Sequence, residues 1–383
     1  MLKDQTAVVG IAETEFSKSL GPSEKSLACR VILEALDDAG IDPSEVDGLS
    51  SYTMETTDAV DVAKTIGAGD VHYFGQIGYG GGAGPGCVGH LAMAVATGQC
   101  QVGVAWRSRK RGSGVRPWAS AMYAQPTAAA AFTRPYGLPR PADEIAMLTR
   151  RYMHQYGATR EHLCNVATAV RKMANNNPKA IMYERTMSRD DYMNARWISE
   201  PLCLFDNCLE TDGALACVIV SAERARDCKQ PAALIHSFGQ GLPSQSHTMT
   251  NYWCEDPLRG PSYACADQLY RNSDIRAEDL SCAQLYDAFS PLIILSLEGY
   301  GFCKRGEGAA YTEDGAIELG GRLPVNTSGG GLSEAYVHGF NLINEGVRQI
   351  RGTSCNQVPD CESTLVTAGE GVPTSALILR KAS

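Results

Sequence analysis

The segment that decides the fold is a glycine cluster that occurs twice, as GGGAGPGCV at residues 80–88 and as GGGLSEAYV at residues 329–337. Each copy runs into a pattern typical of an amphipathic helix, and a strand-like run follows each helix. The helices are predicted over 90–97 and 340–351, and the strands over 101–106 and 363–368. Such internal similarity indicates a duplicated unit. We therefore divide the chain into two similar halves, residues 1–220 and 221–383.

The repeat extends to the N-terminal side of each glycine cluster. GIDPSEVDGLSSY at residues 40–52 corresponds to DIRAEDLSCAQLY at residues 274–286. A helical pattern precedes each segment, and each segment reads as a short acidic turn followed by a strand that ends in tyrosine. Strands that alternate with helices in both halves predict an α/β architecture with mixed sheets and layers of helices.

An insertion at about residues 107–204 separates the core elements of the halves. It contains helical patterns over 142–156 and 160–175, and Thr159 stands where a helix cap is expected. An insertion of this kind suits a substrate lid, and a role in packing or oligomer contacts is an equal alternative. Because no low-complexity linker divides the chain, we expect the halves to form one cooperative unit.

The composition excludes several classes of function. The 383 residues are 44% hydrophobic and carry a net charge of −9, from 34 basic and 43 acidic residues. This balance disfavours a nucleic-acid or phospholipid surface role, because both require a positive surface. The longest apolar runs fall far short of the ~20 residues that a membrane span needs. The N-terminus shows no basic or apolar region of a secretory signal, so the cytoplasm is the predicted location.

Neither a metal nor a bound cofactor is predicted. The fourteen cysteines contain no Cys-x-x-Cys spacing, and the closest pairs lack His or Cys partners at the distances of a zinc site. We expect these cysteines to be reduced and mostly buried. The glycine cluster does not keep the spacing of a dinucleotide fingerprint, and no acidic residue follows at the required distance.

The sequence resembles the thiolase superfamily over nearly its whole length, in the branch of sterol-carrier-protein-x thiolases and thiolase-like lipid-transfer proteins. The family's Asn-Pro-Ser-Gly-Gly and Gly-His-Pro signatures correspond to residues 325–339, where the catalytic histidine falls on Tyr336. Its Asn-Glu-Ala-Phe or His-Asp-Cys-Phe signature corresponds to residues 286–289, where the polar residue is Tyr286. The resemblance implies a five-layered αβαβα thiolase fold.

The nucleophile of a thiolase is missing from this sequence. The family's cysteine falls near Gly82, and its neighbours Gly81 and Ala83 are equally inert. Cys87 lies five residues further on, and we do not assign the nucleophile role to it. The loop of the second active-site cysteine reads AGEG at residues 368–371. These departures exclude Claisen chemistry through an acyl-cysteine.

What remains suits the retro-aldol cleavage of a β-hydroxyacyl-CoA by two phenols. Tyr286 and Tyr336 are the predicted acid–base pair, and which of them is the base stays open. His338, Asp287 and Gly82 are predicted to relay a proton, orient the site or support an oxyanion. Contacts with the substrate are predicted for three further residues, His247, Gly330 and Arg107. Arg107 belongs to a basic run that suits CoA phosphates.

The resemblance to thiolase-like aldolases of bacterial steroid side-chain degradation implies a substrate. It is a 17-hydroxy steroid with a three-carbon acyl-CoA side chain, cleaved to a 17-ketosteroid and propionyl-CoA. The resemblance also implies a homodimer and a complex with a steroid enoyl-CoA hydratase through its OB-fold accessory domain.

Two other functions stay open, a non-catalytic lipid or acyl-CoA carrier and a structural subunit that supports a hydratase. Tyr286 can also be a core aromatic of its strand. Tyrosines at both catalytic positions favour the aldolase, because a carrier needs no acid–base groups there.

Overall fold

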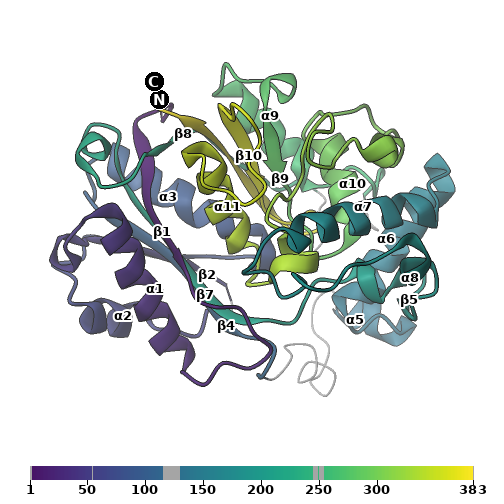
Figure 1. The fold of residues 1–383 in the computed structure, drawn as a ribbon, viewed down its shortest axis with the longest axis horizontal. Coiled ribbons are helices and arrows are strands. Elements are labelled where there is room, and N and C mark those ends of the chain that lie inside the picture. The colour runs from purple at the N-terminus through teal and green to yellow at the C-terminus, as the bar shows by residue number, and fades with distance from the viewer. Residues whose placement is uncertain (1, 54, 115–129, 245–248, 250–253, 383) are drawn as a thin grey trace.

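The computed structural model describes residues 2–53, 55–114, 130–244, 249 and 254–382. Nine strands in this part of the chain form one sheet, in the order β3-β2-β4-β7-β1-β8-β11-β10-β9 (Figure 1). Their bounds are β1 Thr6–Glu13, β2 Gly48–Tyr52, β3 Tyr73–Ile77, β4 Gly103–Lys110, β7 Asp212–Ser221, β8 Ala233–Gly241, β9 Cys282–Gln284, β10 Ser363–Thr367 and β11 Thr374–Lys381. A separate small sheet consists of β5 Trp197–Ser199 and β6 Leu202–Cys203.

The strand order repeats from each edge of the sheet toward its middle. The first half contributes β3-β2-β4-β7-β1, and the second contributes β9-β10-β11-β8, the same order without a counterpart of β3. The halves join at β1 and β8, where Ala7 pairs with Leu234 and Val8 with Ala233. The duplication predicted from the sequence is confirmed.

Tyr52 and Tyr286 occupy equivalent places in the two halves. In the first half β2 pairs in parallel with β4 as far as Ser50, and in the second half β9 pairs in parallel with β10 as far as Gln284. Each tyrosine follows the last of these pairs by two residues. Tyr52 therefore ends its strand, whereas Tyr286 lies just beyond the end of β9.

Helices cover the strands in three layers, which gives the predicted αβαβα arrangement (Figure 1). On the outside of the first half, α1 (Glu24–Ala39) packs on β1, β4 and β7 and also contacts α2 (Ala59–Ile66). On the outside of the second half, α9 (Pro261–Arg271) packs on β8 and β11 and contacts α10 (Ser290–Gly299). Between the halves lie α3 (Gly84–Ala96) and α11 (Phe340–Arg351), which each contact strands of both halves.

The central position of α3 corrects one expectation from the sequence. We predicted an amphipathic helix, but ten of its thirteen residues are buried. A helix packed against the strands of both halves has no solvent face to carry polar residues. Even so, no helix in the described residues is long and apolar enough to cross a membrane.

The insertion lies between β4 and β7 and begins after Lys110, not at residue 107 as predicted, because β4 extends through Lys110. Its helices are α5 Ala130–Thr133, α6 Pro141–Tyr156, α7 Arg160–Asn175 and α8 Arg189–Met193. Thr159 caps α7 as predicted, and its backbone N–H donates to Nδ1 of His162 at 2.9 Å. α7 packs against α10 and against the loop helix Gly330–Glu334 of the second half. The insertion is thereby held beside the second glycine cluster.

Candidate active site

A cavity of about 1250 Å³ lies between the two glycine-rich loops and the insertion. Gly81 of the first loop lines it, as do Tyr336 and His338 of the second. The insertion supplies much of the wall, including Ile145 of α6 and Arg171 of α7. This placement is the one that a substrate lid requires, since residues of the insertion enclose the space beside the reactive groups.

The two predicted tyrosines meet in this cavity. Their hydroxyl groups are hydrogen-bonded to each other, and their ring centroids are 6.0 Å apart. The backbone N–H of Tyr286 donates to Oγ1 of Thr367 at 3.0 Å, and that of Tyr336 donates to Oγ1 of Thr211 at 3.1 Å. Strand β10 and the start of β7 thus hold the two loops in register. Both side chains line the cavity although only 4% and 5% of their surfaces are exposed.

The electrostatics of the two phenols differ. Burial raises the pKa of both above the ordinary value of 10. The guanidinium of Arg111 lies 4.9 Å from the ring centroid of Tyr336, and its charge and hydrogen bond oppose this rise at Tyr336. The hydrogen bond between the phenols raises the pKa of Tyr286 and lowers that of Tyr336. These directions correspond to a pair in which Tyr286 donates and Tyr336 accepts, and the positions of the two oxygens allow either hydroxyl to be the donor.

His338 lines the cavity beside Tyr336, with ring centroids 5.7 Å apart. Its Nδ1 lies 2.6 Å from Nη2 of Arg107. Burial, together with the charges of three nearby arginines, holds the pKa of His338 well below its ordinary value of 6.5. The backbone at His338 is left-handed, with φ of 59°, a conformation that non-glycine residues adopt rarely and mostly at functional sites.

Asp287 organises the loop that carries Tyr336. Its carboxylate accepts hydrogen bonds from the backbone N–H groups of Gly331 at 2.7 Å and Leu332 at 3.1 Å. Burial raises the pKa of Asp287 to about 6. Gly330 is required at its position, because a Cβ there would collide with this carboxylate and the backbone φ is +53°. Neither residue is among those that line the cavity.

The region of the missing nucleophile has no room for a side chain. A Cβ at Gly81 would collide with the hydroxyl of Tyr286, and a Cβ at Gly82 would collide with the carbonyl oxygen of Pro373. Cys87 lies inside α3, where its thiol donates to the carbonyl oxygen of Ser51 at 3.0 Å. Burial raises the pKa of Cys87 to about 12, so the thiolate needed for a nucleophile is absent near neutral pH.

Arg107 and His247 were also predicted to contact the substrate. Arg107 is fully buried in β4 and does not line the cavity, so the predicted contact of Arg107 with CoA phosphates is incompatible with its place. Its guanidinium instead contacts His338 and the carbonyl oxygen of Tyr52, the latter at 2.8 Å. His247 lies outside the described residues.

Two residues of the site were missed. Arg111 belongs to the same basic run as Arg107, and alternation along a strand places residues 107, 109 and 111 on one face. This two-residue alternation along the basic run indicates that an arginine lies beside Tyr336. Glu370 also lines the cavity, and burial raises its pKa to about 7. Nothing in the sequence distinguishes Glu370 from a surface carboxylate.

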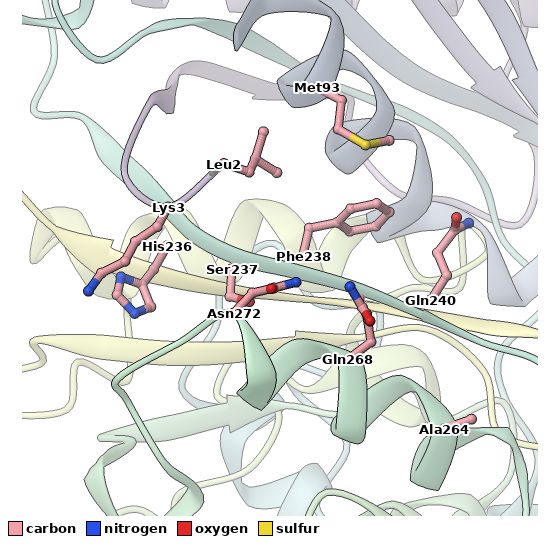
Figure 2. A pocket seen from close by; sticks show the side chains of 11 residues that line it. Leu2, Lys3, Met93, His236, Ser237, Phe238, Gln240, Ala264, Gln268 and Asn272 are labelled. Carbon is pink, nitrogen blue, oxygen red and sulfur yellow. The ribbon is translucent and has the colours of Figure 1, made fainter. Parts of the chain in front are cut away.

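A second cavity, of about 570 Å³, lies between α3, β8 and α9 (Figure 2). Met93 of α3 faces Phe238 of β8 across it, and Gln268 and Asn272 border it from the side of α9. None of the predicted site residues with a described position lines this space. The cavity with the tyrosine pair is therefore the candidate active site.

The chain is similar to known proteins that share this architecture. A family described as "Thiolase C-terminal domain-like" matches residues 244–380. A "Steroid side-chain-cleaving aldolase" of Thermomonospora curvata is 48% identical over 385 residues, which cover 99% of this chain and 98% of that protein. A "17-hydroxy-3-oxo-4-pregnene-20-carboxyl-CoA lyase" of Mycobacterium tuberculosis is 47% identical and covers 99% of this chain and 100% of that protein. The solved structure "Ltp2-ChsH2(DUF35) aldolase" superposes with a TM-score of 0.94 at 48% identity, over 99% of this chain and 98% of that one.

Proposed function

Since this chain belongs to the thiolase-like family of steroid side-chain-cleaving aldolases, we propose that it cleaves the side chain of a 17-hydroxy steroid CoA ester by a retro-aldol reaction. The products are a 17-ketosteroid and propionyl-CoA. The observation that carries this proposal is the hydrogen-bonded phenol pair. The hydroxyl of Tyr286 occupies the space that a side chain at Gly81, beside the position of the thiolase nucleophile, would need. A lipid carrier or a supporting subunit has no use for such a pair.

The reaction follows from the polarity of the pair. Tyr336, as its phenolate, removes the proton of the β-hydroxyl group of the substrate. The Cα–Cβ bond breaks, the ketone forms at Cβ, and the electron pair of the bond moves onto the thioester as an enolate. Tyr286 then donates its proton to Cα, which gives the acyl-CoA. The hydrogen bond between the two hydroxyls returns the proton from Tyr336 to Tyr286 and resets the site.

Tyr336 is the proposed base because two contacts oppose the rise that burial gives to its pKa. Arg111 lies over its ring, and we assign to Tyr286 the donor role in the hydrogen bond between the two hydroxyls. Both interactions stabilise negative charge on Tyr336 and neither is available to Tyr286 in the same form. Asp287 orients the loop of Tyr336 and takes no part in proton transfer. The reaction is redox-neutral, and we propose no cofactor beyond the CoA of the substrate.

Exposed cations that line the cavity are the groups that we propose to bind CoA. Lys18, Arg185 and Arg196 are exposed and line it, and no acidic side chain in the described part of the chain pairs with them. Phosphates of a nucleotide are strongly attracted by such unpaired cations. The steroid then occupies the inner, more apolar part, where Ile145 and Leu292 stand.

We further propose a homodimer and a complex with a hydratase. The free edge of the sheet is β3, where Phe74 is 73% exposed. An open apolar edge of this kind suits side-by-side pairing of two sheets. A similar solved structure is named as a pairing of Ltp2 with ChsH2(DUF35), which favours a second protein on this chain as well.

The decisive experiment uses 17-hydroxy-3-oxo-4-pregnene-20-carboxyl-CoA, offered to the protein alone and with a steroid enoyl-CoA hydratase. We expect a 17-ketosteroid and propionyl-CoA in equal amounts. Binding of the ester without either product, in both mixtures, contradicts the aldolase and favours the carrier. Product that appears only with the hydratase keeps the aldolase and makes the partner necessary.

A further inference from the structure

We propose that Arg107 fixes His338 as a neutral hydrogen-bond donor whose Nε2–H binds the thioester carbonyl oxygen of the substrate. This inference rests on the proposed function and deepens it, because it assigns the group that receives the enolate charge. Arg107 is a positioning residue in this scheme, and His338 is the group that contacts the substrate. A proton relay through His338, one of the roles suggested by the sequence, is then excluded.

The first step is the chemistry of the buried contact. The guanidinium of Arg107 carries only N–H donors and no acceptor. Its Nη2 lies 2.6 Å from Nδ1 of His338, so Nδ1 must offer its lone pair and cannot carry a hydrogen. The single hydrogen of the neutral ring is therefore on Nε2. The contact alone sets the tautomer.

The surroundings of His338 also oppose a second proton. Arg107, Arg109 and Arg111 project from one face of β4 and its continuation, and their positive charges all act on this ring. Two carboxylates, Glu24 and Glu55, act on Arg109, and Glu55 also faces Arg107 at 3.7 Å and accepts a hydrogen bond from the backbone N–H of Ser108. No carboxylate of the described residues is hydrogen-bonded to His338. An imidazolium here would be a further cation in a buried, arginine-rich site.

The ring that carries this donor lies beside the reacting groups. The ring of His338 lines the cavity 5.7 Å from the ring of Tyr336, and Nε2 has no protein hydrogen-bond partner among the described residues. It lies beside Gly80, where a Cβ would stand 3.6 Å from Nε2, in ordinary van der Waals contact. Tyr52 holds the backbone of His338 from the other side, since its hydroxyl donates to the carbonyl oxygen of His338 at 2.9 Å.

This arrangement matches what the reaction needs at the thioester. Cleavage of the Cα–Cβ bond moves an electron pair toward the carbonyl oxygen, and an N–H placed there stabilises the enolate. A neutral imidazole is a weaker acid than an imidazolium, so it donates a hydrogen bond without losing its proton to the enolate. Neutral histidines with this electrophilic role are known in other enolising enzymes.

The tautomer is tested on the wild-type protein by nitrogen-15 NMR of its histidines. We expect His338 to show an unprotonated Nδ1 and a protonated Nε2, unchanged from about pH 5.5 to about pH 9. In Arg107→Gln the amide can donate or accept, so the two tautomers should become mixed if the variant folds. A wild-type His338 that carries its hydrogen on Nδ1, or that titrates in this range, overturns the proposal.

The contact with the substrate is tested by infrared spectroscopy of propionyl-CoA labelled with carbon-13 at the thioester carbonyl. At saturation the wild-type protein should lower the stretching frequency of this carbonyl, and His338→Ala should abolish the shift. His154→Ala, an exposed histidine of α6, is the matched control and should keep it. An unshifted wild-type carbonyl, or a full shift in His338→Ala, contradicts the assignment.

Kinetics separates this inference from the proposed function. His338→Ala should lower kcat about 10²–10³-fold with little change in KM, and His338→Gln, which retains an N–H donor, should recover part of the loss. If the steroid ester is not cleaved by the wild-type protein but the carbonyl shift depends on His338, the aldolase fails and the donor stands. If cleavage is normal in His338→Ala, the donor fails and the aldolase stands.

Discussion

At the scale of single residues, the two phenols carry the chemistry. Tyr286→Phe and Tyr336→Phe each remove one hydroxyl and keep the ring that packs in the cavity wall. We expect each change to lower kcat by about 10²–10⁴-fold, while the affinity for the CoA ester changes little. Steady-state kinetics with the steroid ester measures the first, and calorimetric titration the second. Tyr136→Phe, on a side chain that is 83% exposed, is the control. Near-normal turnover in either variant would show that the phenols are structural.

The pH dependence of kcat/KM follows from the raised pKa values. A base acts only after losing its proton, and burial places the pKa of Tyr336 above 10, so the active fraction grows as the pH rises. Tyr286, whose pKa is also raised, keeps the proton that it must donate. We therefore expect kcat/KM to increase throughout the range from about pH 6 to about pH 9, without a falling limb. A bell-shaped profile centred near neutral pH would indicate Asp287 or His338 as the base.

Single residues also show which parts of the site could be predicted from the sequence and which could not. The tyrosines were identified because they fill positions where thiolases carry other polar groups, and the structure brings them into contact. Arg107 was assigned to the CoA phosphates because it lies in a basic run, but its side chain is fully buried in β4. The contact between Arg107 and His338 joins residues 231 positions apart, and no local pattern announces it.

At the scale of elements, the first glycine cluster makes room for the loop that carries Tyr286. A Cβ at Gly81 would collide with the hydroxyl of Tyr286, which is fixed by Tyr336 and by its own backbone. Gly81→Ala should displace Tyr286 and lower kcat by at least about 10-fold. The accompanying decrease in the free energy of unfolding should be smaller than the increase in the activation free energy. The control is Gly21→Ala, where a Cβ meets nothing within 4 Å. Kinetics on both variants, with circular dichroism to compare their folds, checks this. Equal activity in the two would mean that Tyr286 adjusts freely.

The loop before β11 carries Glu370, whose buried carboxyl group lowers the free energy of unfolding as the pH rises. Burial raises the pKa of Glu370 to about 7 from its ordinary 4.5, so the folded protein holds this proton after the unfolded chain has released it. Stability from this group is therefore lost as the pH rises from about 4.5 to about 7, by about 3 kcal/mol at most. Glu370→Gln stays neutral, and its amide oxygen can still accept from the N–H of Ser262.

The variant should gain stability relative to the wild type as the pH rises from about 5 to about 8. Urea unfolding at both pH values measures the difference, and Glu184→Gln, at an exposed site, controls for the change of charge. A difference that is the same at both pH values would mean that Glu370 is not buried as a neutral acid in solution.

Elements with a strong local pattern were predicted well. The helix over 160–175 and its cap at Thr159 coincide with α7, and the helix over 340–351 coincides with α11, because capping and periodicity act locally. α3 begins six residues before the predicted start at residue 90, because its first turn consists of glycine and proline and is stabilised by packing between the halves. Propensity alone does not predict a helix there.

At the scale of the whole molecule, the two halves share their central layer. α3 belongs to the first half but packs on β8 and β11, and α11 belongs to the second half but packs on β1 and β7. Polar contacts cross the same seam, since Oγ of Ser375 accepts from the N–H of Gly86 at 2.9 Å and donates to the carbonyl oxygen of Gly82 at 2.7 Å. Separation of the halves would expose the apolar surface of both central helices and leave these groups unpaired.

We therefore expect the chain to unfold in one step, although its sequence is a duplication. Scanning calorimetry should give a single transition whose van't Hoff and calorimetric enthalpies agree per cooperative unit. Residues 1–220 expressed alone should lack a cooperative transition, since α3 would have lost its contacts with β8, β11 and α11. The active site depends on the same seam, because Tyr286 and Tyr336 come from the second half while Gly81, Arg107 and Arg111 come from the first. Loss of activity on heating should then coincide with unfolding. Two separate transitions, or a stably folded fragment, would show that the halves are independent domains and that the site forms only by their docking.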